Sequence, residues 1–293
     1  MKASRFWMTI LPACLLFIQC KNNRNEDAID MDRVFAWCIV PFDSMQRTPQ
    51  QRIEMLKELG IKKYAYDWRD RHLEEMVHEW QLARENLIEV SAVWLWLDER
   101  TDTIGKLSPA NERLFANLDS AGLHTDLWLS FNANYFDSLT QDQALAKGIA
   151  IVDYIASRAK SLGCKLVLYN HGDWFGEPEN QVQIIRALPG QDIGIVYSFH
   201  HVHHQLDRYN SLLDTMLPYL KAVNLNGMRR NGPKILPLNE GDEEQAMIRT
   251  LLAKGYTGPL GILGHVEEAD VKQVLEKNKT GLEAILTGIA KRE

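Results

Sequence analysis

The sequence predicts an α/β fold of the (β/α)8 (TIM) barrel type, in which eight parallel strands alternate with eight helices. Its 293 residues are an ordinary length for one such barrel. From residue 34 onward, short apolar runs alternate with stretches of helical spacing. The apolar runs lack strict apolar–polar alternation, as expected for parallel strands that are buried on both faces. An open, doubly wound sheet is the main alternative, but Phe42-Asp43-Ser44 stands where its Gly-rich phosphate loop would follow the first strand.

The predicted strands cover residues 35–40, 63–67, 89–97, 124–131, 165–170, 193–198, 222–226 and 260–264. The predicted helices cover residues 48–59, 73–85, 111–118, 141–162, 179–188, 206–220, 242–254 and the segment from 269 onward. The first helix has the clearest end signals, because Thr48 can cap its N-terminus, Pro49 suits its first position and Gly60 suits its end. Gly163 and Gly255 are expected to end two later helices in the same way.

The first 33 residues are expected to lie outside the barrel, which then spans residues 34–293. Residues 1–5 are basic, residues 6–18 form an apolar run too short to span a membrane, and polar residues begin after Cys20. This pattern predicts a lipoprotein signal peptide over residues 1–20 and a polar tether over residues 21–33. Cys20 would carry the lipid, so we expect an exported, membrane-anchored protein in the periplasm or at the cell surface. Plain secretion, an uncleaved anchor and a buried first helix are the alternatives.

The composition narrows the class of function. Hydrophobic residues make up 45% of the chain, which is enough for a large core. The net charge of −6 argues against a nucleic-acid partner, since a phosphate backbone calls for a basic face. Cys38 and Cys164 lie in apolar runs and are predicted to be buried thiols. The sequence contains no CxxC pair, which argues against a thiolate zinc site.

Histidines gather after the predicted strands. Of the nine histidines, six follow strand ends, namely His171, His200, His201, His203, His204 and His265. Barrel enzymes carry their active sites at the carboxyl ends of the strands. The sequence therefore predicts a histidine-bearing active site at that end of the barrel.

Four of these histidines are candidate metal ligands. His201 and His203 are two residues apart, and on an extended segment both rings would lie on one face. His171 and His265 would complete a site for a divalent metal ion, which would polarise a carbonyl or a pair of hydroxyls. The alternative is metal-free acid–base catalysis, because the pKa of histidine suits neutral pH.

Further polar and aromatic residues are expected at the same end of the barrel. Hydrogen-bonding groups beside Trp rings suit a polyhydroxylated ligand, so a sugar or glycoside is the predicted substrate. Glu177 is the predicted catalytic base, acting with His171 and His201. Trp94 and Trp96 could instead fill the barrel interior. The predicted substrate-binding residues are Asp67, Arg69, Trp94, Trp96, Asn132, Trp174 and Asn226.

Six motifs in the second half of the chain carry a resemblance to a known family. They are Tyr169-Asn170-His171-Gly172, Trp174-Phe175-Gly176-Glu177-Pro178-Glu179-Asn180, Val196-Tyr197-Ser198-Phe199-His200-His201, Leu225-Asn226-Gly227-Met228, Ile235-Leu236-Pro237-Leu238 and Gly261-Ile262-Leu263-Gly264-His265. With these motifs the sequence resembles the xylose isomerase-like barrel superfamily, which includes sugar isomerases and sugar epimerases. The resemblance is closest to an exported bacterial branch often described as sugar phosphate isomerase/epimerase.

The resemblance also implies a set of metal ligands that this sequence does not carry. In the superfamily the metal takes a Glu after the fifth strand, an Asp after the sixth, a His after the seventh and a Glu after the eighth. Here these positions hold Tyr169, Ser198, Asn224 and Gly264. Either the metal site has been rebuilt from histidines, or the metal has been lost. A Gly-rich phosphate loop is also missing after the seventh and eighth predicted strands.

The leading hypothesis is a carbohydrate-active isomerase, epimerase or lyase. It would abstract a proton next to a carbonyl with the assistance of a divalent metal ion. A lyase that eliminates the aglycone from a 3-keto-glycoside is a variant within the same fold. A non-catalytic sugar-binding lipoprotein and a metal-dependent hydrolase are the rivals from other classes.

Overall fold

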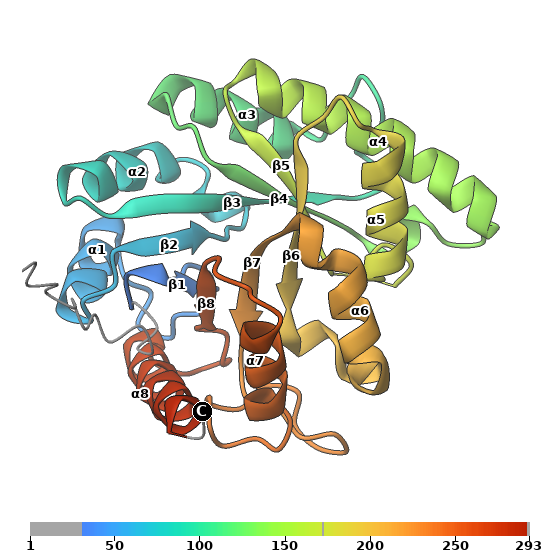
Figure 1. The fold of residues 1–293 in the computed structure, drawn as a ribbon. Coiled ribbons are helices and arrows are strands. Elements are labelled where there is room, and N and C mark those ends of the chain that lie inside the picture. The colour runs from blue at the N-terminus through green and yellow to red at the C-terminus, as the bar shows by residue number, and fades with distance from the viewer. Residues whose placement is uncertain (1–30, 172, 292–293) are drawn as a thin grey trace, which may run out of the picture.

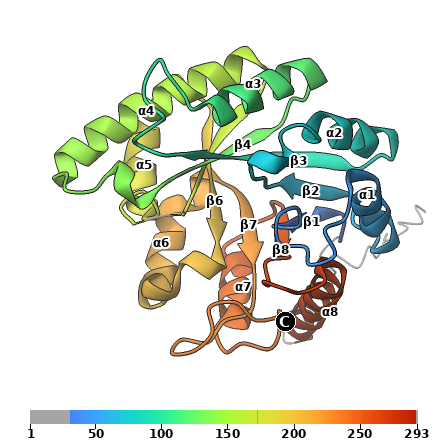
Figure 2. The same cartoon turned by 180° about the vertical axis from the view of Figure 1, so that it is seen from behind.

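A computed structural model describes residues 31–171 and 173–291 and confirms the predicted barrel (Figure 1). Eight parallel strands pair in chain order, and β8 pairs with β1, which closes the sheet. Helices surround the strands, as the view from behind also shows (Figure 2). The predicted signal peptide, Cys20 and most of the predicted tether lie outside the described residues.

The strands are β1 (Val34–Trp37), β2 (Lys63–Tyr66), β3 (Glu89–Leu97), β4 (Asp126–Phe131), β5 (Lys165–Tyr169), β6 (Ile193–Ser198), β7 (Leu220–Leu225) and β8 (Leu260–Leu263). The helices are α1 (Pro49–Glu58), α2 (Met76–Glu85), α3 (Pro109–Ala121), α4 (Gln141–Ser161), α5 (Pro178–Ala187), α6 (Tyr209–Met216), α7 (Glu244–Ala253) and α8 (Val271–Ala290).

The predicted bounds of β3 and β6 are confirmed, and the other strands differ by a few residues. β1 ends at Trp37 because Cys38 adopts a φ of 58°, which takes the backbone out of the extended region. The predicted helix over 206–220 is α6 at its centre, with 3-10 turns over His203–Arg208 and Leu217–Tyr219. Pro218 lies in the second of these turns and has no N–H to donate to a continuing helix.

The predicted end signals of α1 are confirmed. The Thr48 hydroxyl accepts from the backbone N–H of Gln51, and the Gln51 side chain accepts from the backbone N–H of Thr48. Pro49 occupies the first turn, and Gly60 after the helix has a φ of 66°. Such reciprocal capping fixes the residue at which the helix begins and therefore the position at which the preceding loop ends.

The core has two layers. One lies between the strands and the surrounding helices, and the other fills the interior of the barrel. In the interior, the Trp128 ring lies 4.9 Å from the Trp37 ring and 6.0 Å from the Tyr169 ring, centroid to centroid. Cys38 and Cys164 are buried and free, as predicted.

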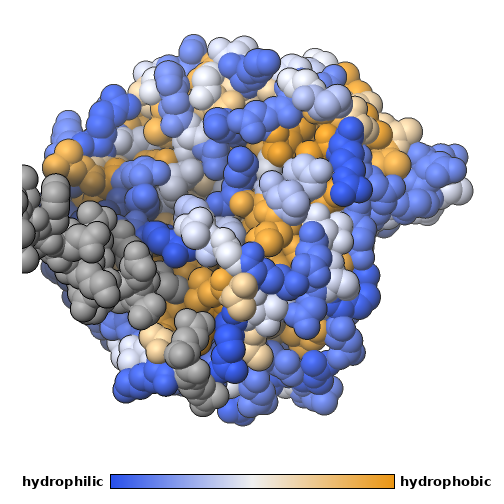
Figure 3. Space-filling model, viewed as in Figure 1, coloured by the Kyte–Doolittle hydropathy of each residue, from blue (hydrophilic) through white to orange (hydrophobic). Residues whose placement is uncertain are grey.

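Polar side chains cover most of the face seen in Figure 3, with hydrophobic residues visible between them. No helix within residues 31–171 and 173–291 is long and apolar enough to cross a membrane.

Candidate active site

A cavity of about 240 Å³ lies at the carboxyl ends of the strands, and we call it the inner chamber. It lies next to the aromatic layer that fills the barrel, since Trp37 and Tyr169 line it. Strand ends or loops after β1, β2, β3, β5, β6 and β8 contribute to it. The lining residues are Trp37, Cys38, Phe42, Asp67, Arg69, Trp94, Tyr169, His171, His200, His201 and His265. The structure thus brings together His171, His201 and His265, as the strand-end argument predicted.

The four histidine rings of the inner chamber lie close to one another. The His201 ring centroid is 3.6 Å from that of His200 and 4.6 Å from that of His171. His265 lies 6.2 Å from His200 and stacks on Phe42 at 3.7 Å. These contacts join the loops after β1, β5, β6 and β8 around one small space.

A hydrogen-bonded chain links Trp37, Tyr169 and His201. The indole N–H of Trp37 donates to the Tyr169 hydroxyl over 3.3 Å, and this hydroxyl lies 3.2 Å from Nε2 of His201. The hydroxyl has one proton and two lone pairs, so it can donate to Nε2 or accept from it, according to the tautomer of His201. In the tautomer that accepts the Tyr169 proton, the proton of the neutral His201 ring is on Nδ1. Tyr169 was not predicted as a site residue, because it reads as the apolar end of a strand.

Burial keeps the histidines of the inner chamber neutral. Burial, together with the neighbouring His265 and His171, lowers the pKa of His200 to about 3. Burial likewise lowers the pKa of His171, His201 and His265 below their usual range. Near pH 7 these rings are uncharged, so each can donate one hydrogen bond and accept another.

Asp67 has the properties of an acid–base group. Its side chain is buried at the end of β2, with Oδ1 accepting the Val40 N–H over 3.2 Å and Oδ2 without a hydrogen-bond partner. Burial raises the pKa of Asp67 to about 6, although the Val40 N–H and the Arg69 charge oppose the change. A carboxyl group with a pKa near neutrality can both take and return a proton at physiological pH. The sequence assigned Asp67 to substrate binding, because its burial could not be read from its position.

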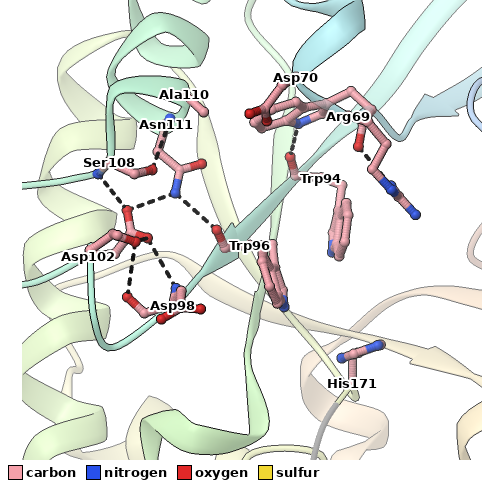
Figure 4. Close-up of a pocket in the computed structure, with 12 residues that line it drawn as sticks. Arg69, Asp70, Trp94, Trp96, Asp98, Asp102, Ser108, Ala110, Asn111 and His171 are labelled. Carbon is pink, nitrogen blue, oxygen red and sulfur yellow. Dashed lines mark hydrogen bonds between the residues drawn. The ribbon is translucent and has the colours of Figure 1, made fainter.

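A second cavity of about 520 Å³ adjoins the first, and we call it the outer chamber (Figure 4). It is lined by Trp68, Arg69, Asp70, Trp94, Trp96, Asp98, Thr101, Asp102, Ser108, Ala110, Asn111 and His171. Arg69, Trp94 and His171 line both chambers, so the two cavities lie side by side. Trp94 and Trp96 therefore line cavities, and the alternative that they only fill the barrel interior is wrong.

Arg69 is held between two aromatic rings. Its guanidinium lies 5.3 Å from the ring centroids of both Phe42 and Trp94, and it donates to the backbone oxygen of Trp68 over 2.7 Å. This places a fixed positive charge where the two chambers meet.

The expected four-histidine metal site is not formed in the described residues. Residues 199–201 and 203–208 form 3-10 turns, so the predicted extended segment through His201 and His203 is wrong. His203 does not line the inner chamber, and its Nε2 lies 3.2 Å from the backbone oxygen of Arg229. Within residues 31–171 and 173–291, no three His, Cys, Asp or Glu side chains are placed to hold a metal ion. The residues present therefore do not fit the metal that the resemblance implies.

Four further predicted residues, Glu177, Asn226, Asn132 and Trp174, do not line the inner chamber. Glu177 precedes α5 and accepts from His204 over 2.7 Å and from Arg208 over 2.8 Å, so the structure does not place it as a base beside His171 and His201. Asn226 is buried, and its amide donates to the backbone oxygens of Gly227 and Lys234. Asn132 and Trp174 line a third cavity of about 40 Å³, which His171 borders.

Comparison with known proteins identifies the fold. No family model matches the sequence, and no curated protein sequence matches it. Among solved structures, D-psicose 3-epimerase in the presence of D-fructose is 15% identical with a TM-score of 0.65, covering 88% of this chain and 99% of that chain. The 3-keto-D-glucoside 4-epimerase YcjR from E. coli is 14% identical with a TM-score of 0.65, covering 87% and 99%. A xylose isomerase-like TIM barrel protein from Mycobacterium smegmatis in complex with magnesium is 18% identical with a TM-score of 0.52, covering 86% and 92%. The chain thus has the fold of the xylose isomerase-like barrels, as its sequence motifs indicated.

Asp67→Asn should stabilise the folded protein above about pH 6. A folded-state pKa of about 6, against the ordinary 3.8, means that ionising the buried carboxyl opposes folding as the pH rises through this interval. The gain at pH 8 is at most roughly 3 kcal/mol and should vanish below about pH 4. Urea unfolding at pH 4, 6 and 8 measures it.

Asp98→Asn is the matched control and should act in the opposite direction. Hydrogen bonding from Arg100 lowers the pKa of Asp98 below its usual range, so removing this carboxylate should destabilise the protein at neutral pH. Equal stability of the wild type and Asp67→Asn at pH 8 would contradict the raised pKa of Asp67.

Proposed function

We propose that this protein is a carbohydrate-active enzyme that abstracts a proton from the carbon next to a sugar carbonyl. Isomerisation, epimerisation and elimination share this step. The proposal rests mainly on one observation, which is that Asp67, whose Oδ2 has no hydrogen-bond partner within residues 31–171 and 173–291, lies in one small chamber with neutral histidines. The likeness of the fold to sugar epimerases supports it.

In the proposed first step, Asp67 is the base. The carbon-bound proton passes to Oδ2 of Asp67, and the electrons of the broken C–H bond form the double bond of an enediolate. The negative charge develops on the former carbonyl oxygen, where a hydrogen-bond donor is needed. The Nδ1–H of His201 can supply this donor in the tautomer whose Nε2 accepts from Tyr169. His171, whose buried Nδ1 has no hydrogen-bond partner among residues 31–171 and 173–291, is the second candidate.

The second step decides the outcome. If a second acid on the opposite face gives a proton to the same carbon, the product is an epimer and Asp67 later releases its proton to solvent. If Asp67 returns its proton to the neighbouring carbon while the hydroxyl proton moves to the other enediolate oxygen, the product is an isomer. If a glycosidic oxygen is bound to the adjacent carbon, the enediolate electrons can expel it instead. The leaving oxygen then takes up a proton, and the product is an unsaturated keto sugar. This elimination is the second candidate function, and the outer chamber beside the reacting carbon favours it because a leaving group needs space.

The proposed reaction assigns no step to a metal ion. The four positions where the resemblance implies metal ligands carry Tyr169, Ser198, Asn224 and Gly264. None of these side chains is a carboxylate or an imidazole, the ligand groups that the resemblance implies there. Asp67 and the neutral histidines supply the base and the hydrogen-bond donors that the step requires.

Loss of the Asp67 carboxylate should abolish proton abstraction. We expect Asp67→Asn to lower the rate of carbon–hydrogen exchange by roughly 10³-fold, within the range for a general base. The assay is proton NMR in D₂O with D-fructose, D-psicose and methyl 3-keto-glucosides as substrates. In the wild type, kcat/KM should rise through about pH 6 and then level off, since only the ionised Asp67 acts as a base.

Asp153→Asn, an exposed substitution on α4, is the control and should leave the exchange rate unchanged. Exchange at the wild-type rate in Asp67→Asn would refute the assigned base. If the wild type exchanges no hydrogen on any of these sugars, the protein is a sugar-binding protein and not an enzyme of this class.

Chelation should not affect turnover. Because the strand ends lack the carboxylate ligands that the resemblance implies, we expect the same rate before and after dialysis against EDTA. Elemental analysis of the purified protein checks this directly. A stoichiometric metal ion whose removal stops the reaction, and whose return restores it, would reinstate metal assistance.

We also propose that the protein is exported and anchored to a membrane through a lipid on Cys20. The support is the order of segments in residues 1–33, in which a basic segment is followed by an apolar segment and then by a polar one. In cells fed labelled palmitate, Cys20→Ala should lose the label and leave the membrane fraction. Cys14→Ala is the control, because Cys14 lies inside the apolar run, and it should keep both the label and the membrane location. Labelling that depends on Cys14 would contradict the assigned anchor.

A further inference from the structure

We propose that the outer chamber is a second sugar subsite, so that the substrate is an uncharged glycoside of at least two rings. One ring would react in the inner chamber while the next ring is held in the outer chamber. This inference rests on the proposed function for the placement of the reacting ring. It adds the substrate class.

The volumes and the positions of the two chambers suit such a ligand. The inner chamber, at about 240 Å³, is smaller than the sites that usually hold small molecules, whereas the outer chamber has about 520 Å³. Arg69, Trp94 and His171 line both chambers, so a ligand of two rings that lies across these residues would contact both cavities. A monosaccharide bound in the inner chamber would leave the larger cavity unfilled.

The outer chamber has an aromatic platform. Trp94 and Trp96 are two residues apart on β3, so their side chains lie on the same face of the strand. Their ring centroids are 6.3 Å apart and their planes differ by 31° (Figure 4). Trp96 is 36% exposed although it is a large apolar side chain. Flat aromatic faces at successive positions suit the C–H faces of successive sugar rings.

The platform is held in place without a ligand. The Trp94 indole N–H donates to the Ser130 hydroxyl over 2.7 Å, which fixes the orientation of that ring. The backbone oxygen of Trp94 accepts from the Trp68 indole over 2.7 Å, and that of Trp96 accepts from the Asn111 amide over 2.9 Å. A preorganised surface costs little entropy to order when a ligand binds, which favours affinity.

The opposite wall is also built before binding. Asp102 accepts from the backbone N–H groups of Asp98 and Ser108 over 3.1 and 2.8 Å, and from the side chains of Thr101 and Asn111 over 2.9 and 2.8 Å. Figure 4 shows this carboxylate at the centre of the wall. Four hydrogen bonds to one residue hold the segment after β3 at a fixed distance from the Trp rings.

The charges of the outer chamber favour an uncharged second ring. Asp70, Asp98 and Asp102 line it, and Arg69 is the single Lys or Arg among its described lining residues. The Arg69 guanidinium is already packed between two rings at the junction. Arg100 pairs with Asp98, and Asp102 already accepts four hydrogen bonds. A phosphate group would still meet more negative than positive charge here, whereas a hydroxyl group can donate to Asp70.

The test compares disaccharides with their component monosaccharides. Isothermal titration calorimetry on the full chain would use cellobiose, maltose and lactose against glucose and galactose, with Asp67→Asn as the host to prevent turnover. We expect at least one disaccharide to bind about tenfold or more tightly than its monosaccharides. Trp96→Ala should remove most of this advantage and change monosaccharide affinity by less than about twofold, which is the signature of a separate subsite.

Two variants keep the test interpretable. Trp96→Leu retains apolar bulk without an aromatic face and should lose the same advantage, even if Trp96→Ala proves unstable. Leu87→Ala, at an 89% exposed position at the opposite end of the barrel, is the matched control and should bind as the host does.

Each outcome separates this inference from the proposed function. Equal affinity for monosaccharides and all three disaccharides, or equal weakening of both classes by Trp96→Ala, would overturn the second subsite. Hydrogen exchange on a monosaccharide would then still support the proposed reaction. A disaccharide preference that depends on Trp96, without hydrogen exchange in the wild type, would support the subsite and refute the reaction.

Discussion

The aromatic layer inside the barrel is the constraint on which the candidate site depends. Trp37, Trp128 and Tyr169 pack against one another across the interior, and aromatic pairs of this kind contribute about 0.5–1.5 kcal/mol beyond the area they bury. The layer separates the inner chamber from the rest of the barrel. It also places the Tyr169 hydroxyl within hydrogen-bonding distance of His201. The packing of the barrel interior and the hydrogen bonding of the chamber thus share Trp37 and Tyr169.

Burial by this layer explains the electrostatics of the chamber. Several imidazoles whose rings lie within a few ångströms of one another cannot all be charged, and desolvation keeps them neutral. Asp67 and Arg69 are then the two groups of the inner chamber that carry a full charge near neutral pH. Their opposite signs limit the net charge of a site that must accept the additional negative charge of an enediolate.

Much of the architecture could be predicted from the sequence, because strands buried on both faces and capped helices leave local signals. β3 and β6 have their predicted bounds, and Thr48 caps α1 as its spacing indicated. The strand-end rule also placed His171, His201 and His265 correctly in one cavity. These successes depend on topology, which fixes where strand ends meet regardless of side-chain detail.

Local geometry and burial set the limits of that prediction. The 3-10 turns after β6 separate His203 from His201, and no pattern in the sequence distinguishes such turns from an extended segment. Glu177 is engaged by His204 and Arg208, which come from a segment more than twenty residues away. Asp67 and Tyr169 gain their roles from the depth at which they are buried, a property of the closed barrel and not of their neighbours in sequence.

The wall around Asp102 has an evolutionary consequence. The inner chamber draws its residues from six strand ends, so few of them can change without disturbing the others. Asp98, Asp102, Ser108 and Asn111 instead belong to one continuous segment that runs from the end of β3 into the first turn of α3. Insertions or replacements in this single loop can alter the preference for the second ring while the reacting centre stays intact. Selection for new glycosides could therefore act on one stretch of the gene, and libraries for directed evolution can be confined to it.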